Sequence, residues 1–269
     1  MTLTTLLIIF LLGLCVGSFV NVLIYRTLNG MSPYKGRSLC DKCRRQLSWY
    51  ENIPVVSYVV LGGKCRTCKK KIDWSYPVVE FVTGLLFLWW GTLGLAFFKL
   101  SSFPHLYVQP VFWLVVGIIL VVIFFADLLH MIIPDVALGS LIILTVAYRL
   151  YLVHSGVMQL NDLWLALFSG VVVSIAFLCL FLVTKGRGLG FGDVKFVFMM
   201  GLLLGFPKIV VGIFMAFLLG GMMGILLLGL RLKKMGQKVP FGPFLIGGLL
   251  IALVWGNGIW SWYMQFLGW

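Results

Sequence analysis

The chain has 269 residues, of which 61% are hydrophobic and only 11% are charged. A soluble domain carries roughly a quarter charged residues, so this composition excludes a soluble globular enzyme and excludes disorder more firmly. The chain has 21 Lys and Arg against 8 Asp and Glu, a net charge of +13. In a membrane protein such an excess first indicates topology, because Lys and Arg collect on the cytoplasmic side of the bilayer, and we predict no nucleic-acid partner.

Apolar runs that approach the roughly 20 residues needed to cross a bilayer recur along the chain. The first, at about 3–25, is predicted to be an uncleaved anchor with an external N-terminus, because no basic residue precedes it as in a signal peptide. The later runs lie at about 78–98, 108–127, 133–153, 163–184, 194–206, 209–230 and 243–265. Together they predict an all-α polytopic membrane protein with about eight transmembrane helices. The run 194–206 is short, so it either crosses the bilayer tilted or is only partly inserted.

The basic residues support this arrangement. With the N-terminus outside, only Lys99, Arg149 and Lys208 of the 21 Lys and Arg residues fall on the external side. This asymmetry favours eight spans with both chain ends external. The basic cluster at 35–71 also suits the head groups of anionic lipids.

Residues 26–77 differ from the rest, since they are polar and basic and contain two Cys-x2-Cys pairs. Two such pairs can offer four thiolates to one tetrahedral metal, as in a zinc ribbon. Two disulfides are the main alternative, but the predicted cytoplasmic location disfavours them, and a redox pair is a second alternative. Four thiolates leave no open position, so we predict a structural Zn²⁺ held by Cys40, Cys43, Cys65 and Cys68.

Two carboxylates fall where a bilayer makes them costly. Asp127 ends one apolar run and Asp193 begins another, after Gly190-Phe191-Gly192, and both are predicted at the cytoplasmic ends of spans. Two facing carboxylates permit acid–base catalysis on water, because like charges a few ångströms apart do not both ionise cheaply. The glycines at 190 and 192 would let an extended substrate approach closely.

Each of these carboxylates also has a structural interpretation. Asp127 could cap the following link or pair with His130, and Asp193 could cap its helix or pair with Lys195. A proton relay in a transporter would use the same two groups, but the sequence shows no carboxylate at mid-depth. A zinc-ribbon scaffold without catalysis is the third hypothesis.

Three further acids are candidates for a functional role that also have a structural explanation. Glu80 lies just inside the second span, where either a functional role or a pair with a loop cation would explain it. Glu51 lies in the polar segment, where a cation would pair with it, and Asp135 follows Pro134 at a predicted helix start, where capping is expected.

With these motifs in order, the sequence resembles the type IV prepilin leader peptidases, a group of GxGD-type intramembrane aspartyl proteases. The resemblance covers nearly the whole chain. It rests on Gly17–Arg26, both cysteine pairs, Glu51–Tyr58, Tyr76–Gly84, Asp127 with Ile133–Asp135, Gly190–Lys195 and Pro240–Phe244.

The resemblance implies a bacterial inner-membrane enzyme that removes the basic leader from type IV prepilins or type II secretion pseudopilins, after a glycine. It assigns the catalytic roles to Asp127 and Asp193, and the zinc ligands to the four cysteines. It also implies N-methylation of the new N-terminus with S-adenosylmethionine, associated with the cysteine-bearing loop. Glu80, Glu51 and Asp135 are candidates for substrate binding or methyl transfer.

The expected organisation is therefore a first helix at 1–25, a zinc-binding cytoplasmic domain at 26–77 and a seven-helix peptidase domain at 78–269. The active site is expected at the cytoplasmic face. The sequence leaves the oligomeric state open.

Overall fold

The computed structural model describes residues 2–32, 36–94, 105–186, 188–232 and 239–268. Over these ranges the secondary structure is helical and contains no strand, and two isolated β-bridges join Leu39 to Gln46 and Lys64 to Lys71. The predicted all-α fold class is thus confirmed for the described part of the chain. The chain divides into two compact units, Met1–Phe125 and Ala126–Trp269.

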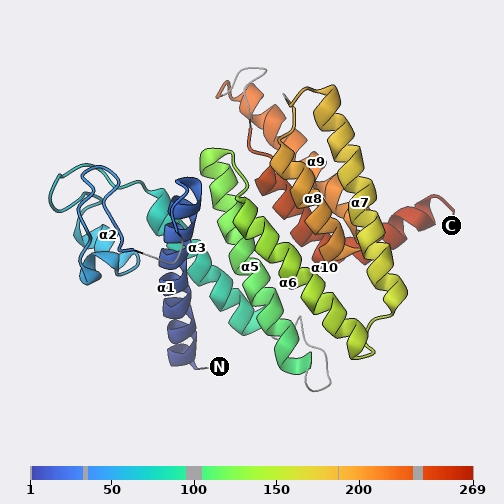
Figure 1. Cartoon of the computed structure of the whole chain (residues 1–269), viewed down its shortest axis with the longest axis horizontal. Coiled ribbons are helices and arrows are strands. Elements are labelled where there is room, and N and C mark those ends of the chain that lie inside the picture. The colour runs from blue at the N-terminus through green and yellow to red at the C-terminus, as the bar shows by residue number, and fades with distance from the viewer. Residues whose placement is uncertain (1, 33–35, 95–104, 187, 233–238, 269) are drawn as a thin grey trace. The chain divides into compact units, whose positions relative to one another are not determined.

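The first unit is built on two packed helices that lie side by side in Figure 1, α1 (Leu3–Leu28) and α3 (Ser75–Trp89). Their contact needs small residues, since a Cβ atom on Gly13 would lie 2.8 Å from the Cα of Gly84. Small residues at such crossings let membrane helices approach closely. Between these two helices the chain forms the cysteine-bearing loop. The other elements of the unit are η1 (Trp49–Asn52), α2 (Val56–Val60), η2 (Trp90–Gly94) and most of α5 (His105–His130).

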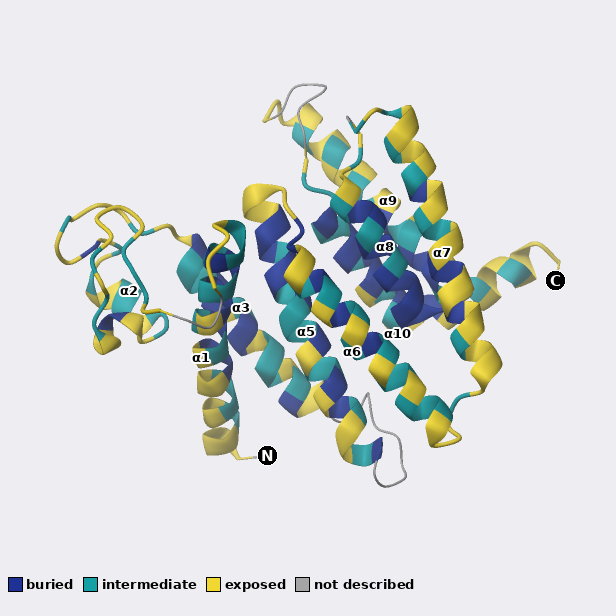
Figure 2. Cartoon of the chain, in the orientation of Figure 1, coloured by how far each residue is buried: buried dark blue, intermediate teal, exposed yellow. Residues whose placement is uncertain are grey.

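The second unit surrounds one short helix, α8 (Phe191–Leu204), which packs against its neighbours in the unit. Most of its side chains are buried, as the dark segment at its centre shows in Figure 2. Gly201 meets the backbone of Gly170 so closely that neither position has room for a Cβ atom. The neighbouring helices are α6 (Asp135–His154), α7 (Leu160–Val183), α9 (Lys208–Gly229) and α10 (Gly242–Phe266).

Seven helices of the described residues are long and apolar enough to cross a membrane, which confirms a multi-pass membrane protein. Each falls on a predicted span, with ends that differ by a few residues. The eighth predicted span corresponds to α8, whose 14 residues extend about 21 Å, less than the roughly 30 Å hydrocarbon layer. The count of eight spans therefore stays a prediction. Several basic residues behind the predicted orientation lie outside the described residues: Lys35, Lys99, Arg187, Lys233, Lys234 and Lys238.

Large apolar side chains are exposed along the outer faces of the helices (Figure 2). Ile8 on α1 is 58% exposed, and Phe168 on α7 is 66% exposed. Apolar surface of this extent would cause aggregation in water and is expected against lipid. The predicted separate domain at 26–77 stays a prediction, since the structure groups these residues with α1 and α3 in one unit.

Candidate active site and metal centre

Asp127 lies in the last turn of α5, at the start of the second unit. It is 5% exposed, and its Oδ2 accepts a hydrogen bond of 2.8 Å from the backbone N–H of Gly242, the first residue of α10. A Cβ atom at position 242 would lie 2.6 Å from the same oxygen, so the approach requires glycine. The contact places Asp127 against α10, whereas the sequence suggested a cap or a pair with His130.

Asp193 lies in the first turn of α8 and is 6% exposed. Its Oδ2 accepts a hydrogen bond of 2.9 Å from the backbone N–H of Gly190, which precedes the helix. Asp193 therefore contributes to capping, but from the third helical position and not as the N-cap residue. The alternative pair with Lys195 is not formed, because that ammonium binds Asp135.

The carboxyl groups of Asp127 and Asp193 belong to the same unit and are close enough to interact electrostatically. Each is held by one backbone amide that belongs to a glycine. Among the described residues, no Lys or Arg forms an ion pair with either carboxyl group. Two carboxyl groups that repel each other favour a state in which one is protonated and the other is not, and acid–base attack by water on an amide needs one of each.

Asp135 and Gly192 both mark where the start of α6 approaches the first turn of α8. Asp135 is the first residue of α6 and Pro134 is the N-cap, so Asp135 lies in the first turn and is not the N-cap residue. Its carboxylate forms an exposed ion pair of 2.7 Å with Lys195. A groove of about 480 Å³ runs beside this pair, lined by α6, α7 and α8. A Cβ atom on Gly192 would lie 3.2 Å from the Cβ of Ile133, so this glycine keeps α8 close to the start of α6.

The four cysteines of the loop lie together. Their Sγ atoms are all within 4.8 Å of one another, and Sγ of Cys40 lies 4.0 Å from Sγ of Cys68. Ligands of one tetrahedral zinc lie about 3.8 Å apart, given Zn–S bonds of about 2.3 Å. The cluster therefore fits a single metal ion.

The two cysteine pairs adopt the same backbone conformation. The N–H of Arg44 donates to the carbonyl of Cys40, and the N–H of Lys69 donates in the same way to the carbonyl of Cys65. Both Arg44 and Lys69 have a positive φ, 58° and 56°. The loop thus contains two matching knuckles, each of which presents two thiols.

The thiol of Cys65 lies close to backbone donors of its own knuckle. Hydrogen bonds from the backbone N–H of Cys68, and then of Thr67, lower its pKa to about 6. A depressed pKa increases the thiolate fraction near neutral pH, and thiolate is the form that binds metal. This preorganisation is consistent with a zinc ligand.

Glu51 serves the loop itself. Its Oε1 binds Arg45 at 2.6 Å and its Oε2 accepts from the N–H of Ser48. The hydrogen bond from Arg45 is the main reason that the pKa of Glu51 lies below its ordinary value. The predicted cation partner is therefore identified as Arg45, which the sequence alone did not single out.

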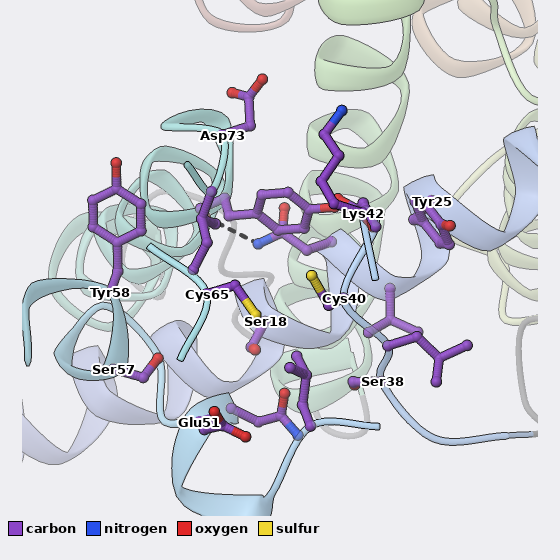
Figure 3. A pocket seen from close by; sticks show the side chains of 18 of the residues that line it. Ser18, Tyr25, Ser38, Cys40, Lys42, Glu51, Ser57, Tyr58, Cys65 and Asp73 are labelled. Atoms are coloured by element: carbon purple, nitrogen blue, oxygen red, sulfur yellow. Dashed lines mark hydrogen bonds between the residues drawn. The ribbon is translucent and has the colours of Figure 1, made fainter. Parts of the chain in front are cut away.

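Glu80 of α3 and Glu51 of η1 both line a cavity of about 930 Å³ in the first unit. Figure 3 shows Ser18 and Tyr25 of α1 around this cavity together with Cys40, Glu51 and other residues of the loop. Oε2 of Glu80 accepts a hydrogen bond of 2.7 Å from the backbone N–H of Val55. The partner of Glu80 is thus a backbone amide of the loop, whereas the sequence interpretation proposed a loop cation.

Sequence reasoning missed two site residues. The sequence marks Gly242 only as part of the run Pro240–Phe244, and nothing in it predicts proximity to Asp127 across a separation of 115 residues. Val55 carried no signal, because its importance lies in its backbone N–H.

The comparisons with known proteins agree with these observations. Residues 11–92 match the bacterial peptidase A24 N-terminal domain, and residues 114–225 match the type IV leader peptidase family. A Pseudomonas aeruginosa protein named prepilin leader peptidase/N-methyltransferase is 33% identical, over 96% of this chain and 93% of its own length. A protein of the same name from Bacillus subtilis is 30% identical, over 96% of this chain and 97% of its own length. Another from Myxococcus xanthus is 35% identical, over 82% of this chain and 62% of its own length. No solved structure matches the chain.

Proposed function

The chain belongs to the type IV leader peptidase family and is a membrane peptidase with methyltransferase activity, and we propose that Asp127 and Asp193 carry out the cleavage. The observation that supports this assignment is their arrangement: two buried carboxyl groups in one unit, each hydrogen-bonded to the amide of a glycine and within electrostatic reach of the other. The comparisons give no support to the alternative of a proton-coupled transporter.

The proposed cleavage needs one carboxylate and one carboxylic acid. The carboxylate takes a proton from water as the water oxygen attacks the scissile carbonyl carbon, and the acid donates its proton to the carbonyl oxygen. The tetrahedral intermediate then collapses and the C–N bond breaks, as the leaving nitrogen takes a proton from the group that accepted it from water. A hydroxyl of the intermediate gives its proton to the group that protonated the carbonyl oxygen as the C=O bond re-forms, so both groups return to their starting states.

The proposed substrates are type IV prepilins or type II secretion pseudopilins, cut after the glycine that ends their basic leader. Such a substrate has a cationic segment in the cytoplasm followed by an apolar helix in the bilayer. We therefore place the enzyme in the bacterial inner membrane, with its active site at the cytoplasmic face and both chain ends on the other side. The carboxylate of Asp135, near the start of α8, is proposed to attract the leader cations.

The cysteine cluster is proposed to bind a structural Zn²⁺. Four thiols at metal-binding distance fill a tetrahedral coordination sphere, which leaves no position for a reacting water. A loop with little core of its own depends on such a metal for its folded state. The zinc would fix the loop against α1 and α3.

The methyl donor for the second activity is proposed to be S-adenosylmethionine, which supplies a methyl group from a sulfonium to the new N-terminal amine. The chain's part is to bind the donor and to accept a proton from the amine. The first unit, with its cysteine loop, is the proposed location of this step.

The test of this function is in vitro processing of a prepilin peptide by the purified chain with S-adenosylmethionine present. Mass spectrometry should show loss of the leader and a gain of one methyl group on the remaining peptide. An intact peptide after prolonged incubation would contradict the proposed cleavage, and a cleaved but unmodified peptide would contradict the proposed methyl transfer.

A further inference from the structure

The cavity of the first unit has the volume of a site for a small organic molecule. It measures about 930 Å³, within the range of about 300–1,000 Å³ typical of ligand sites. Its walls come from α1, the cysteine loop and α3, so three consecutive segments of the chain converge on it (Figure 3). The peptidase residues Asp127 and Asp193 belong to the other unit, and the cleavage mechanism makes no use of this cavity.

Glu80 gives the cavity a buried negative charge. The residue is 9% exposed and, among the described residues, no Lys or Arg forms an ion pair with it. Glu51, the other buried acid in the wall, is already neutralised by Arg45. A buried carboxylate without a cation is costly, so a cationic ligand would stabilise the site.

The hydrogen bond between Val55 and Glu80 holds the loop against α3 beside the cavity. Val55 has φ 60°, which is strained for a β-branched residue, and its N–H points to Oε2 of Glu80. Strain of this kind persists only where the surrounding structure enforces it, and it concentrates at ligand sites. Ser57 and Tyr58 of the next helix, α2, then face the cavity.

The rest of the wall suits a zwitterion that carries a flat ring. Tyr25, Tyr58 and Trp74 line the cavity, and aromatic faces stack on flat rings and attract cations. Arg66 also lines it, and guanidinium groups bind carboxylates. A purine ring, a sulfonium, an ammonium and a carboxylate together would use all of these groups.

We propose that this cavity binds S-adenosylmethionine, with Glu80 supplying the negative charge for its cationic methionine end. The inference rests on the methyl transfer proposed above and assigns that reaction its binding site. The pilin amine must come to the same place, but a single ammonium would leave most of a cavity of this volume empty.

The test measures binding, separately from catalysis. The purified full chain in detergent is titrated calorimetrically with S-adenosylmethionine and with S-adenosylhomocysteine. Glu80→Gln keeps an oxygen that can accept the Val55 N–H but removes the charge. We expect it to weaken S-adenosylmethionine binding roughly tenfold or more, as expected for loss of a charged hydrogen-bonding partner. Asp162→Asn, an exposed acid of the second unit, is the matched control and should bind like the wild type.

A second pair of variants tests the cavity itself. Ser57→Trp fills it from α2, and Val60→Trp places the same ring on the same helix where the side chain is 78% exposed and does not line the cavity. We expect the first to abolish binding of both compounds and the second to leave it unchanged. Zinc content and thermal melting confirm that each variant is folded.

The outcomes separate the binding site from the function. Wild-type binding that neither Glu80→Gln nor Ser57→Trp reduces would overturn this site and leave the methyl transfer intact. A wild-type chain that binds neither compound would overturn both. Loss of binding in both variants, with the two controls unaffected, would support the proposal.

Discussion

The amide of Gly242 donates a hydrogen bond of 2.8 Å to the Oδ2 of Asp127, across 115 residues of sequence. This contact joins the end of α5 to the start of α10, and it leaves no room for a side chain at position 242. The run Pro240–Phe244 therefore serves the carboxylate directly. It supplies the backbone donor for one of the two carboxylate oxygens.

The first prediction concerns this glycine. A Cβ atom introduced by Gly242→Ala would lie 2.6 Å from Oδ2 of Asp127, so the carboxylate or the start of α10 must move. We expect kcat for prepilin cleavage to fall by about a hundredfold, since misplacement by about 1 Å can cost that much. Gly258→Ala, in the same helix with open space around it, is the control. Equal rates in the two variants would show that the contact is unimportant.

The second prediction concerns the metal. Mass spectrometry of the purified chain should find about one zinc per molecule, because four thiols fill one tetrahedral site. Cys40→Ser should release the zinc and, with the loop loosened, weaken S-adenosylmethionine binding more than it slows cleavage. Cys179→Ser, an exposed cysteine of α7, should keep the zinc. Full zinc occupancy in Cys40→Ser would contradict the assignment.

The third prediction tests whether Asp135 attracts the leader. Its ion pair with Lys195 is exposed and contributes little to stability, so the charge of residue 135 can be reversed without unfolding the chain. We expect Asp135→Lys to raise KM for a prepilin with a basic leader about tenfold, with a small effect on kcat. A peptide whose leader lysines are replaced by glutamine should show no such increase. An unchanged KM for the basic peptide would remove Asp135 from the substrate site.

The fourth prediction uses the strained turn at Val55. Glycine adopts φ 60° freely, whereas valine pays about 1–2 kcal/mol there, so Val55→Gly should raise the thermal stability of the zinc loop while keeping the N–H that Glu80 binds. Val59→Gly, within α2, should instead destabilise by about 1 kcal/mol. Thermal unfolding, monitored by the release of zinc, would measure the change in stability of both variants. A loss of stability in Val55→Gly would mean that the valine side chain matters more than the backbone strain.

Most of the helices could be predicted because membrane spans have a strong signal. A run such as Val111–Ala126 needs only length and hydropathy to be recognised, and the structure gives a helix around it. The short α8 was the exception. Its burial among the other helices of the unit explains why a run too short to cross the bilayer is apolar from Phe196 to Leu204.

The cysteine cluster was predictable for a similar reason, because ligand spacing is local and each knuckle is a few residues long. The contacts of Glu80, Glu51 and Asp127 were not predictable, because their partners are the backbone of Val55, the side chain of Arg45 and the backbone of Gly242. A backbone donor leaves no trace in residue type unless, as at Gly242, it also demands the absence of a side chain. Only the fold brings such groups together.

The most direct test of the central claim is cleavage of a prepilin peptide by Asp127→Asn and by Asp193→Asn, each in detergent with zinc content and S-adenosylmethionine binding measured on the same sample. Asparagine keeps an oxygen for the Gly242 or Gly190 amide, so the fold should persist. The account predicts that both variants retain zinc and bind the donor but show no detectable leader loss. Cleavage at a rate within tenfold of the wild type in either variant would contradict it.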